Sequence, residues 1–238
     1  MIGWLIYSAV DVEKNKYYIQ MYKDKFKEHF IEIKLVIVEE LENMEQYVKC
    51  NKVDFAINRS RNHIMGELLE QKGVRVFNSS SVTRIANNKG ITYEFLKDVV
   101  PFLAVKYGNE IIESKIENKG FEYPYVIKSC SGHGGSQVFL VNNRKEEEQA
   151  VKAMNGQEYV VQQCCSDLGR DVRAYIIGNK IIKAVLRTST ESFKSNYSLG
   201  GKVQEYTLNN EEKAMVERIV DKLPLDYAGI DFTFKAFR

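Results

Sequence analysis

The sequence contains few residues of the kinds that build metal centres or disulfide frameworks. It has four cysteines, Cys50, Cys130, Cys164 and Cys165, and no CxxC spacing. Adjacent cysteines rarely pair with each other, so all four are predicted to be reduced thiols, as is typical of a cytoplasmic protein. Of the three histidines, only His133 lies near a cysteine. Two candidate ligands do not make a structural zinc site.

Signals for export, membrane insertion and nucleic-acid binding are also missing. Residues 1–10 are apolar, but they lack the basic segment and the small-residue cleavage site of a signal peptide. No run approaches the roughly 20 apolar residues of a membrane span. The 34 basic and 32 acidic residues give a net charge of +2, without the basic excess of a nucleic-acid-binding domain. We therefore expect a cytoplasmic protein that binds neither membrane nor nucleic acid.

The composition is that of an ordinary globular protein with room for more than one core. The chain has 238 residues, of which 44% are hydrophobic and 28% charged. Over residues 1–80, short apolar runs alternate with helical patterns, which predicts an open, mostly parallel sheet covered on both faces. The predicted strands are 2–7, 33–38, 54–58 and 74–77, and the predicted helices lie around 19–30, 41–48 and 64–71. The turn after the first strand has no glycine fingerprint, so no dinucleotide site is expected there.

From about residue 80 the regular alternation of strand and helix stops. Two short helices are predicted between residues 79 and 101, and a polar helix between 106 and 125. The clearest signal is the hairpin of residues 172–187, in which two β-rich runs flank Gly178 and Asn179. The other predicted strands are 101–106, 125–129, 137–141, 158–162 and 227–234, with helices at 143–154 and 211–223.

The first candidate site is a strand that ends at Lys128 and runs into the loop SGHGGS, Ser131–Ser136. Glycines let backbone amides approach an anion closely, and a neighbouring lysine adds a positive charge for phosphate. This is not a Walker A sequence, because the lysine precedes the glycines and no helix follows. A flexible hairpin loop with a surface lysine is the alternative.

Three further groups of polar residues follow strands or lie on them. Asp171 and Arg173 are two residues apart on a strand and share a face, which predicts either a ligand site or an exposed salt bridge. Arg187 is followed by a loop carrying Lys194, Ser195 and Asn196, a set that suits a transferring phosphoryl group or simply a solvated loop.

Asp231 is the last candidate. It lies on an otherwise apolar strand, where an acid is costly unless it meets a metal or a cation. Two or more carboxylates normally share a magnesium ion, so Asp231 needs a partner.

Taken in order, these clusters resemble the ATP-grasp superfamily. Their motifs are most similar to those of its RimK-like carboxylate–amine (glutamate) ligases. The resemblance covers about residues 73–234 through VIK and the glycine loop, VQQ, GRDVRAYIIGNKIIKAVLR, FKSNYSLGG and DYAGID. It implies an α/β pre-ATP-grasp domain, 1–80, followed by an ATP-grasp fold of two α+β subdomains. These are residues 81–160, with the glycine-rich lid, and 161–238, which is incomplete.

The resemblance also implies roles for individual residues. The residues that would bind ATP are Lys89, Lys128, Ser131, Gly132, His133, Gly134, Gly135, Gln162, Gln163, Cys164, Cys165, Asp171, Lys194 and Ser195. Within this set Lys89 and Lys128 would contact the phosphates, the backbone of residues 162–165 would recognise adenine, and Asp171 would hold the ribose hydroxyls. Lys194 and Ser195 would lie beside the catalytic residues. Arg173, Arg187 and Asn196 would be catalytic, facing the γ-phosphate and the acyl-phosphate. Asp231 would be the first ligand of Mg²⁺, with Mn²⁺ as an alternative.

The family chemistry implied is amide formation from a carboxylate and an amine through an acyl-phosphate, often with glutamate as the added unit. The chain ends before the strand on which the family carries its remaining metal ligands, a glutamate and an asparagine. An ATP-binding module without catalysis is therefore the second hypothesis. The third hypothesis is an interaction protein without a ligand. It would require all four clusters to be surface residues that bind nothing.

Two smaller questions stay open in the sequence. His133 could donate to a phosphate or a substrate carboxylate, or could be an exposed loop histidine. The early aromatic residues could form a homo-oligomer face or pack on the first sheet; they are Tyr17, Tyr18, Tyr22, Phe26 and Phe30.

Overall fold

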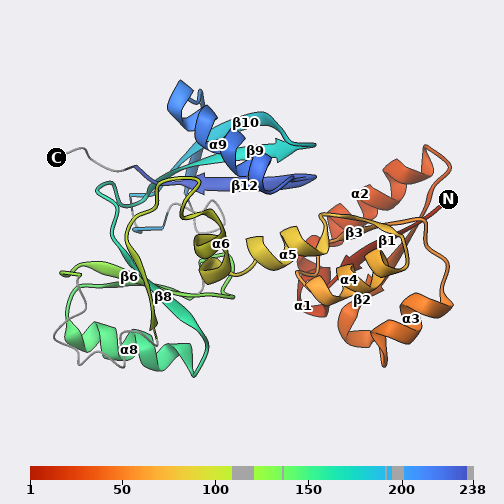
Figure 1. The fold of residues 1–238 in the computed structure, drawn as a ribbon, viewed down its shortest axis with the longest axis horizontal. Coiled ribbons are helices and arrows are strands. Elements are labelled where there is room, and N and C mark those ends of the chain that lie inside the picture. The colour runs from red at the N-terminus through yellow and green to blue at the C-terminus, as the bar shows by residue number, and fades with distance from the viewer. Residues whose placement is uncertain (109–120, 136, 191, 195–200, 235–238) are drawn as a thin grey trace. The chain divides into compact units, whose positions relative to one another are not determined.

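The computed structural model describes residues 1–108, 121–135, 137–190, 192–194 and 201–234. The chain forms two compact units, Met1–Ala86 and Asn87–Arg238 (Figure 1). The predicted fold class is confirmed: a parallel α/β part is followed by two antiparallel sheets with helices. Among the described helices, none combines the length and apolar character that crossing a bilayer requires.

The first unit contains a parallel sheet of four strands in the order β2-β1-β3-β4. The strands are β1 (Ile2–Tyr7), β2 (Glu32–Ile37), β3 (Phe55–Asn58) and β4 (Arg75–Phe77). The helices are α1 (Ala9–Val12), α2 (Lys16–Lys27), α3 (Met44–Cys50), α4 (His63–Gln71) and α5 (Ser80–Ala86), with 3₁₀ turns at Glu13–Asn15 and Val38–Glu40.

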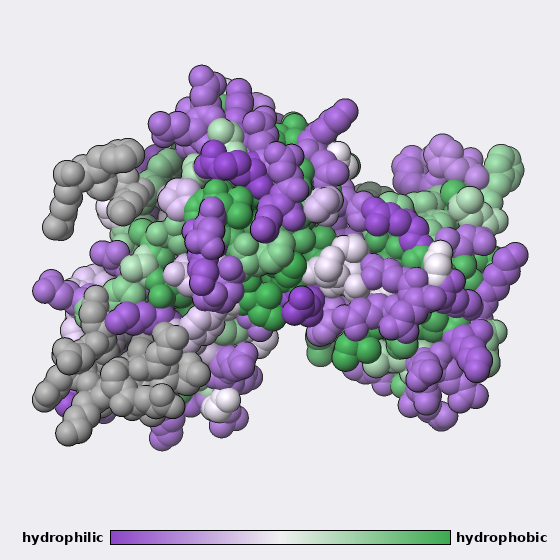
Figure 2. Space-filling model, in the orientation of Figure 1, coloured by the Kyte–Doolittle hydropathy of each residue, from purple (hydrophilic) through white to green (hydrophobic). Residues whose placement is uncertain are grey.

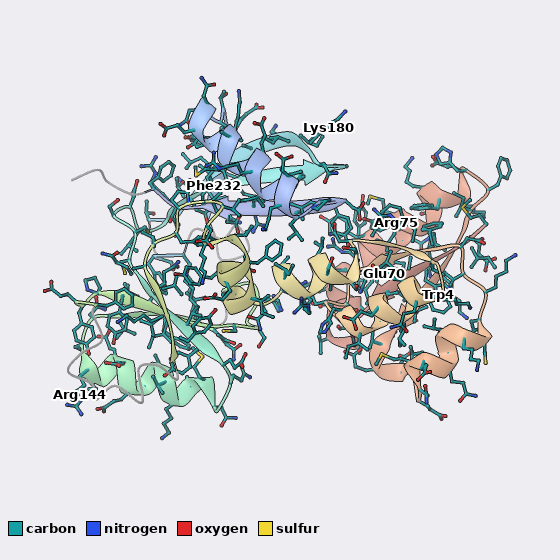
Figure 3. The ribbon with its side chains drawn as sticks, viewed as in Figure 1. Trp4, Glu70, Arg75, Arg144, Lys180 and Phe232 are labelled. Carbon is teal, nitrogen blue, oxygen red and sulfur yellow. The ribbon has the colours of Figure 1, made fainter. Side chains whose placement is uncertain are left out.

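Helices cover both faces of this sheet, as the sequence predicted. Trp4, labelled in Figure 3, is fully buried and packs with Val48 of α3 and Met65 of α4 on one face. On the other face the ring of Phe55 stacks on Phe26 of α2, with centroids 5.5 Å apart. The aromatics of the α2 region are thus divided: Phe26 packs on the sheet, whereas Tyr17, Tyr18 and Phe30 are exposed.

The helix α5 belongs to the first unit because it is fixed to α4. The carboxylate of Glu70 accepts hydrogen bonds from the backbone N–H and the hydroxyl of Ser80. The two helices approach closely at Gly66, where a Cβ would lie 3.1 Å from the Cβ of Ser80. The predicted domain limits at residues 80 and 160 stay predictions.

The second unit contains two antiparallel sheets. The first has the order β5-β8-β6-β7, and the second β11-β10-β9-β12. The strands are β5 (Val105–Tyr107), β6 (Tyr125–Ser129), β7 (Val138–Val141), β8 (Tyr159–Gln163), β9 (Arg170–Ile177), β10 (Lys180–Thr188), β11 (Lys202–Tyr206) and β12 (Tyr227–Phe232). The described helices of this unit are α6 (Lys89–Leu96), α8 (Arg144–Met154) and α9 (Asn210–Lys222).

Each of these sheets carries a helix on one face. Ala150 and Met154 of α8 are buried in a core with Tyr125 and Ile127 of β6. In the view of Figure 1, α9 is drawn in front of the second sheet; its residues Val216 and Val220 are buried, and the outer surface in this region is mostly hydrophilic (Figure 2). Asn209 caps α9 in a reciprocal capping box with Glu212, which fixes where the helix begins.

Some predicted elements differ from the observed ones. The strand β11 was missed, because KVQEY is largely exposed and carries few apolar residues. The helix predicted around 41–48 begins only at Met44, capped by Asn43, and the acids at 39 and 40 lie in a 3₁₀ turn. The polar helix predicted between 106 and 125 lies largely outside the described residues.

Candidate functional site

Two lysines of the second unit meet beside the glycine loop. Lys128 on β6 donates a hydrogen bond of 2.6 Å from Nζ to Oε1 of Gln162 on the neighbouring β8. Lys89 is the first residue of α6, and its Nζ donates to the carbonyl oxygen of Gly132. Its backbone N–H donates to the carbonyl of Cys130 at 2.9 Å. The start of α6 is thereby fixed to the end of β6.

A third lysine reaches the same loop from the other sheet. Lys194, in the segment after β10, donates from Nζ to the carbonyl oxygen of Gly135 at 2.6 Å. Lysine side chains thus contact the glycine loop near both of its ends, at Gly132 and at Gly135. In the described part of the chain, none of Lys89, Lys128 and Lys194 pairs with a carboxylate.

Burial is the main influence on the pKa values of these lysines. Burial lowers the pKa of Lys89, and it also lowers the pKa of Lys194. Burial lowers the pKa of Lys128 as well, and the nearby charge of Lys89 lowers it further. A buried cation without an anionic partner is costly, so an anion that binds here would relieve that cost.

The glycine loop has a backbone that suits this purpose. Gly134 and Gly135 have φ angles of 63° and 81°, which L-residues rarely adopt. Ser131 and His133 are exposed. Ser136 lies outside the described residues.

A glycine and a tyrosine that the sequence analysis did not single out place Lys89. The hydroxyl of Tyr107 on β5 donates to the carbonyl of Gly90 at 2.9 Å. A Cβ at Gly90 would lie 2.8 Å from the tyrosine ring. The tyrosine can therefore pack against the first turn of α6 only because residue 90 has no side chain.

The predicted adenine segment continues from β8. The backbone N–H of Gln163 donates to the carbonyl of Ala104 at 2.9 Å, which ties the segment to the chain before β5. Cys164 and Cys165 follow it and are half-buried, and burial raises the pKa of the Cys164 thiol. Both thiols lie near enough to Lys128 to affect its pKa.

Four charged residues form one ionic network on the second sheet. Arg187 on β10 donates from Nε and Nη2 to the two carboxylate oxygens of Asp171 on β9, each at 2.6 Å. Arg173 makes the same paired contact with Asp231 on β12, also at 2.6 Å. Arg187 joins the two pairs, because its Nη2 lies 3.1 Å from Oδ1 of Asp231. We call Asp171, Arg173, Arg187 and Asp231 the ionic quartet.

Strand register explains the ionic quartet. Arg187 is directly opposite Asp171, and Asp231 is directly opposite Arg173. The alternating residues of β9, Val172 and its successors, are buried on the other face. Asp171 and Arg173 do share a face, as predicted, but each pairs with a residue of a neighbouring strand rather than with the other.

Members of the quartet differ in accessibility. The side chains of Arg187 and Asp171 are 6% and 14% exposed, whereas those of Arg173 and Asp231 are 32% and 40% exposed. Gly229 makes room for the guanidinium of Arg173, because a Cβ there would lie 3.2 Å from Nε. Arg173 and Asp231 are therefore the members that a ligand can reach.

The residues around Asp231 do not by themselves fit a magnesium ion. Both of its oxygens accept hydrogen bonds from arginines. Within the described ranges, no group of three or more acids, histidines or cysteines could hold a metal. The assignment of Asp231 as a metal ligand stays a prediction.

Gly169 connects the quartet with Lys194, a role that the sequence analysis did not assign. Its N–H donates to the carbonyl of Phe193 at 3.0 Å, and its carbonyl accepts from the N–H of Ser189 at 2.8 Å. Its φ is 75°, and a Cβ would lie 2.6 Å from the carbonyl oxygen of Ser189. Of the predicted site residues, Ser195 and Asn196 fall outside the described residues.

The two antiparallel sheets, the glycine loop and the three lysines without a carboxylate partner form the candidate site of the second unit. Residues 97–237 match the family described as the RimK-like ATP-grasp domain, which is more than half of the chain, and the chain belongs to that family. The predicted resemblance is thus confirmed.

Three relatives show the range of proteins to which the chain is similar. The chain is 31% identical over 224 residues to the uncharacterized protein MG011 of Mycoplasma genitalium, covering 93% of this chain and 75% of the relative. It is 26% identical over 167 residues to a probable alpha-L-glutamate ligase of Haemophilus ducreyi, covering 67% and 54%. It is 29% identical over 174 residues to human beta-citrylglutamate synthase B, covering 70% and 45%. The chain thus spans only about half the length of the last two.

Solved structures confirm the fold. A RimK domain ATP-grasp protein of Sphaerobacter thermophilus superposes with a TM-score of 0.72 at 20% identity, covering 97% of this chain and 85% of the other. The D-alanine–D-alanine ligase of Bacillus anthracis, solved in complex with ATP, gives a TM-score of 0.75 at 16% identity, covering 99% and 82%.

Proposed function

We propose that the chain is an ATP-dependent ligase that forms an amide between a carboxylate and the amine of an amino acid such as glutamate. The observation that carries the proposal is the group of three lysines around the glycine loop, which has no carboxylate partner in the described part of the chain. A triphosphate supplies the negative charge that this group lacks. The printed names of the relatives, a glutamate ligase and a citrylglutamate synthase, support the reaction class and the amino acid.

In this proposal the nucleotide lies along β6 and β8. Lys89, Lys128 and Lys194 hold the phosphates, and the lysine contacts to the carbonyls of Gly132 and Gly135 give way to phosphate oxygens. The adenine base lies against the backbone of Cys164 and Cys165, because the N–H of Gln163 already donates to the carbonyl of Ala104. Since Asp171 is bound by Arg187, its role as ribose ligand requires a hydroxyl to share the carboxylate.

The chemistry proceeds in two steps. A carboxylate oxygen of the acceptor attacks the γ-phosphorus, the bond to the β–γ bridging oxygen breaks, and ADP leaves. The neutral amine then attacks the acyl carbon, inorganic phosphate leaves with the C–O electron pair, and the nitrogen gives up a proton. Arg173 retains N–H groups beyond the two bound to Asp231 and donates them to the transferring phosphoryl group. Arg187, nearly buried, holds both aspartates in place.

A trapping assay tests the reaction. The chain is incubated with ATP, magnesium, a panel of carboxylates that includes citrate and peptides with free C-termini, and L-glutamate or hydroxylamine as the amine. We expect ADP release that requires both a carboxylate and an amine, and a hydroxamate when hydroxylamine replaces glutamate. ADP release that is independent of any carboxylate would contradict the acyl-phosphate route.

A second candidate function is ATP binding without turnover. It is favoured by one observation, the two arginines that hold both oxygens of Asp231. In that case ATP binds, yet neither ADP nor hydroxamate forms with any acceptor in the panel.

A further inference from the structure

An open pocket lies in the first unit, at the carboxyl ends of its strands. It has a volume of about 350 Å³, and its lining residues are Ser8, Val38, Glu39, Ser60, Arg61, Asn62, His63 and Ile64. Ser8 follows β1, Val38 and Glu39 follow β2, and residues 60–64 follow β3. We call this the switch-point pocket.

The strand order explains why a pocket opens at this place in the sheet. From β1 the chain crosses to β2 on one side, and from β2 it crosses back over β1 to β3 on the other side. The helical connections after β1 and β3 therefore diverge, and a crevice opens between them. In open parallel sheets, ligands bind at this point, outside the carboxyl ends of the strands.

The floor of the pocket is rigid and polar. Two of the lining residues, Ser8 and Ser60, are buried, and so is Asn58, the hydrogen-bond partner of Ser60. The hydroxyl of Ser8 donates to the carbonyl of Ser60 at 2.9 Å, and the hydroxyl of Ser60 donates to Oδ1 of Asn58 at 2.7 Å. The loops after β1 and β3 are thus fixed to each other, so the pocket is formed before a ligand arrives.

The lining carries charges of both signs. Oε2 of Glu39 accepts from the N–H of Ala9 at 2.8 Å, which orients the carboxylate. Arg61 pairs with Asp11, which holds its guanidinium in place. The side chain of His63 makes no hydrogen bond with any residue in the described ranges. A ligand with one cationic and one anionic group matches this lining.

Other ligand classes fit less well. A dinucleotide or a free phosphate needs close backbone approach, and the turn after β1 contains no glycine. The negative charge of Glu39 opposes a ligand that carries only anionic groups. A small zwitterion provides a cationic group for Glu39 and an anionic group for Arg61 and His63.

We propose that the switch-point pocket binds an α-amino acid, with its ammonium group at Glu39 and its carboxylate at Arg61 and His63. The proposed function supplies only the choice of probe, L-glutamate as the amine substrate. The pocket itself rests on the topology and the lining residues.

Heteronuclear NMR on the full chain tests the site. Titration with L-glutamate should shift the backbone amides of residues 8–9, 39 and 60–64. N-acetyl-L-glutamate, which lacks the ammonium group, should bind at least about tenfold more weakly, because it loses a charge-assisted hydrogen bond.

Matched variants locate the two ends of the ligand. Glu39→Gln keeps an acceptor for Ala9 but loses the charge, and should weaken L-glutamate at least about tenfold. Glu40→Gln, at an exposed neighbour outside the pocket, should leave the affinity unchanged. His63→Ala should weaken binding, and His29→Ala should not.

The outcomes separate this inference from the proposed function. Shifts confined to other residues, equal binding of N-acetyl-L-glutamate, or no glutamate binding by a chain that binds ATP would each overturn the pocket assignment. Glutamate binding at these residues by a chain that forms no hydroxamate would retain the pocket and contradict the ligase.

Discussion

Buried charge in the second unit is satisfied in two different ways. Lys89, Lys128 and Lys194 donate to neutral oxygens, whereas each member of the ionic quartet meets an opposite charge at 2.6 Å. The quartet is balanced before any ligand arrives, and the lysines are not. We therefore assign anion binding to the lysines and a mainly structural role to the buried half of the quartet.

We predict that the affinity for ATP depends on pH through the lysines. Burial lowers the pKa of Lys89 and Lys128 in the free protein, and a bound phosphate raises it again. Between the lowered pKa and the ordinary lysine value of about 10.4, binding must therefore take up protons, and affinity falls as pH rises. Calorimetry in two buffers of different ionisation enthalpy measures the uptake.

The same shift affects the stability of the free protein with a defined sign. In that pH window the unfolded chain binds more protons than the folded one, so these groups make stability increase with pH.

For the calorimetric test of ATP binding, proton release in this pH window would contradict the assignment of the lysines. Lys128→Met should reduce the uptake, and Lys145→Met, an exposed residue of α8, should not.

Breaking the quartet should destabilise the second unit. Asp171→Ala leaves the nearly buried Arg187 without its paired partner, and we expect a loss of about 2–4 kcal/mol in the free energy of unfolding. Urea titration measures it. The double variant Asp171→Leu with Arg187→Met should recover much of the loss, because no uncompensated charge remains.

Asp221→Ala is the control for this series. Asp221 is exposed on α9, and its loss should change stability by no more than about 0.5 kcal/mol. If Asp171→Ala were equally mild, the quartet would be a solvated surface feature.

At the scale of elements, local signals were predicted well and non-local ones were not. The turn at Gly178 and Asn179 was readable because both residues have positive φ, 55° and 64°, which is what this hairpin turn demands. The strand β11 could not be predicted from its sequence, because its pairing with β10 rather than its own residues determines its structure. The same limit applies to the quartet, whose partners come from three strands.

Gly169 offers a test of how one element positions the site. Gly169→Ala places a Cβ 2.6 Å from the carbonyl of Ser189 at a positive φ, so the segment that carries Lys194 must move. We expect a loss of about 1–3 kcal/mol in stability and weaker ATP binding. Thermal unfolding and calorimetry measure the two effects.

Gly178→Ala is the matched control for backbone strain. Gly178 also has a positive φ, but nothing lies within 4 Å of its Cβ position. It should lose about 1 kcal/mol in stability and leave ATP affinity unchanged. If Gly169→Ala left ATP affinity unchanged as well, Gly169 would not position Lys194.

At the scale of the molecule, the sequence predicted the fold class and the family but only part of the site's geometry. Lys128 beside the glycine loop was visible as a local pattern. Lys89 entered only through the family resemblance, because its proximity to Lys128 arises from the packing of α6 on β8 and from the hydrogen bond of its N–H to the carbonyl of Cys130. The switch-point pocket was not predicted, because its residues follow three separate strands and form no motif.

The most direct test of the account is the affinity of the chain for ATP, measured by calorimetry on the wild type, Lys128→Met and Lys145→Met. The account predicts that the wild type binds ATP, that Lys128→Met weakens binding by about 10- to 100-fold while remaining folded, and that Lys145→Met binds as the wild type does. Equal affinity in Lys128→Met, or no binding by the folded wild type with or without magnesium, would contradict the assignment of the lysines as the ATP phosphate site.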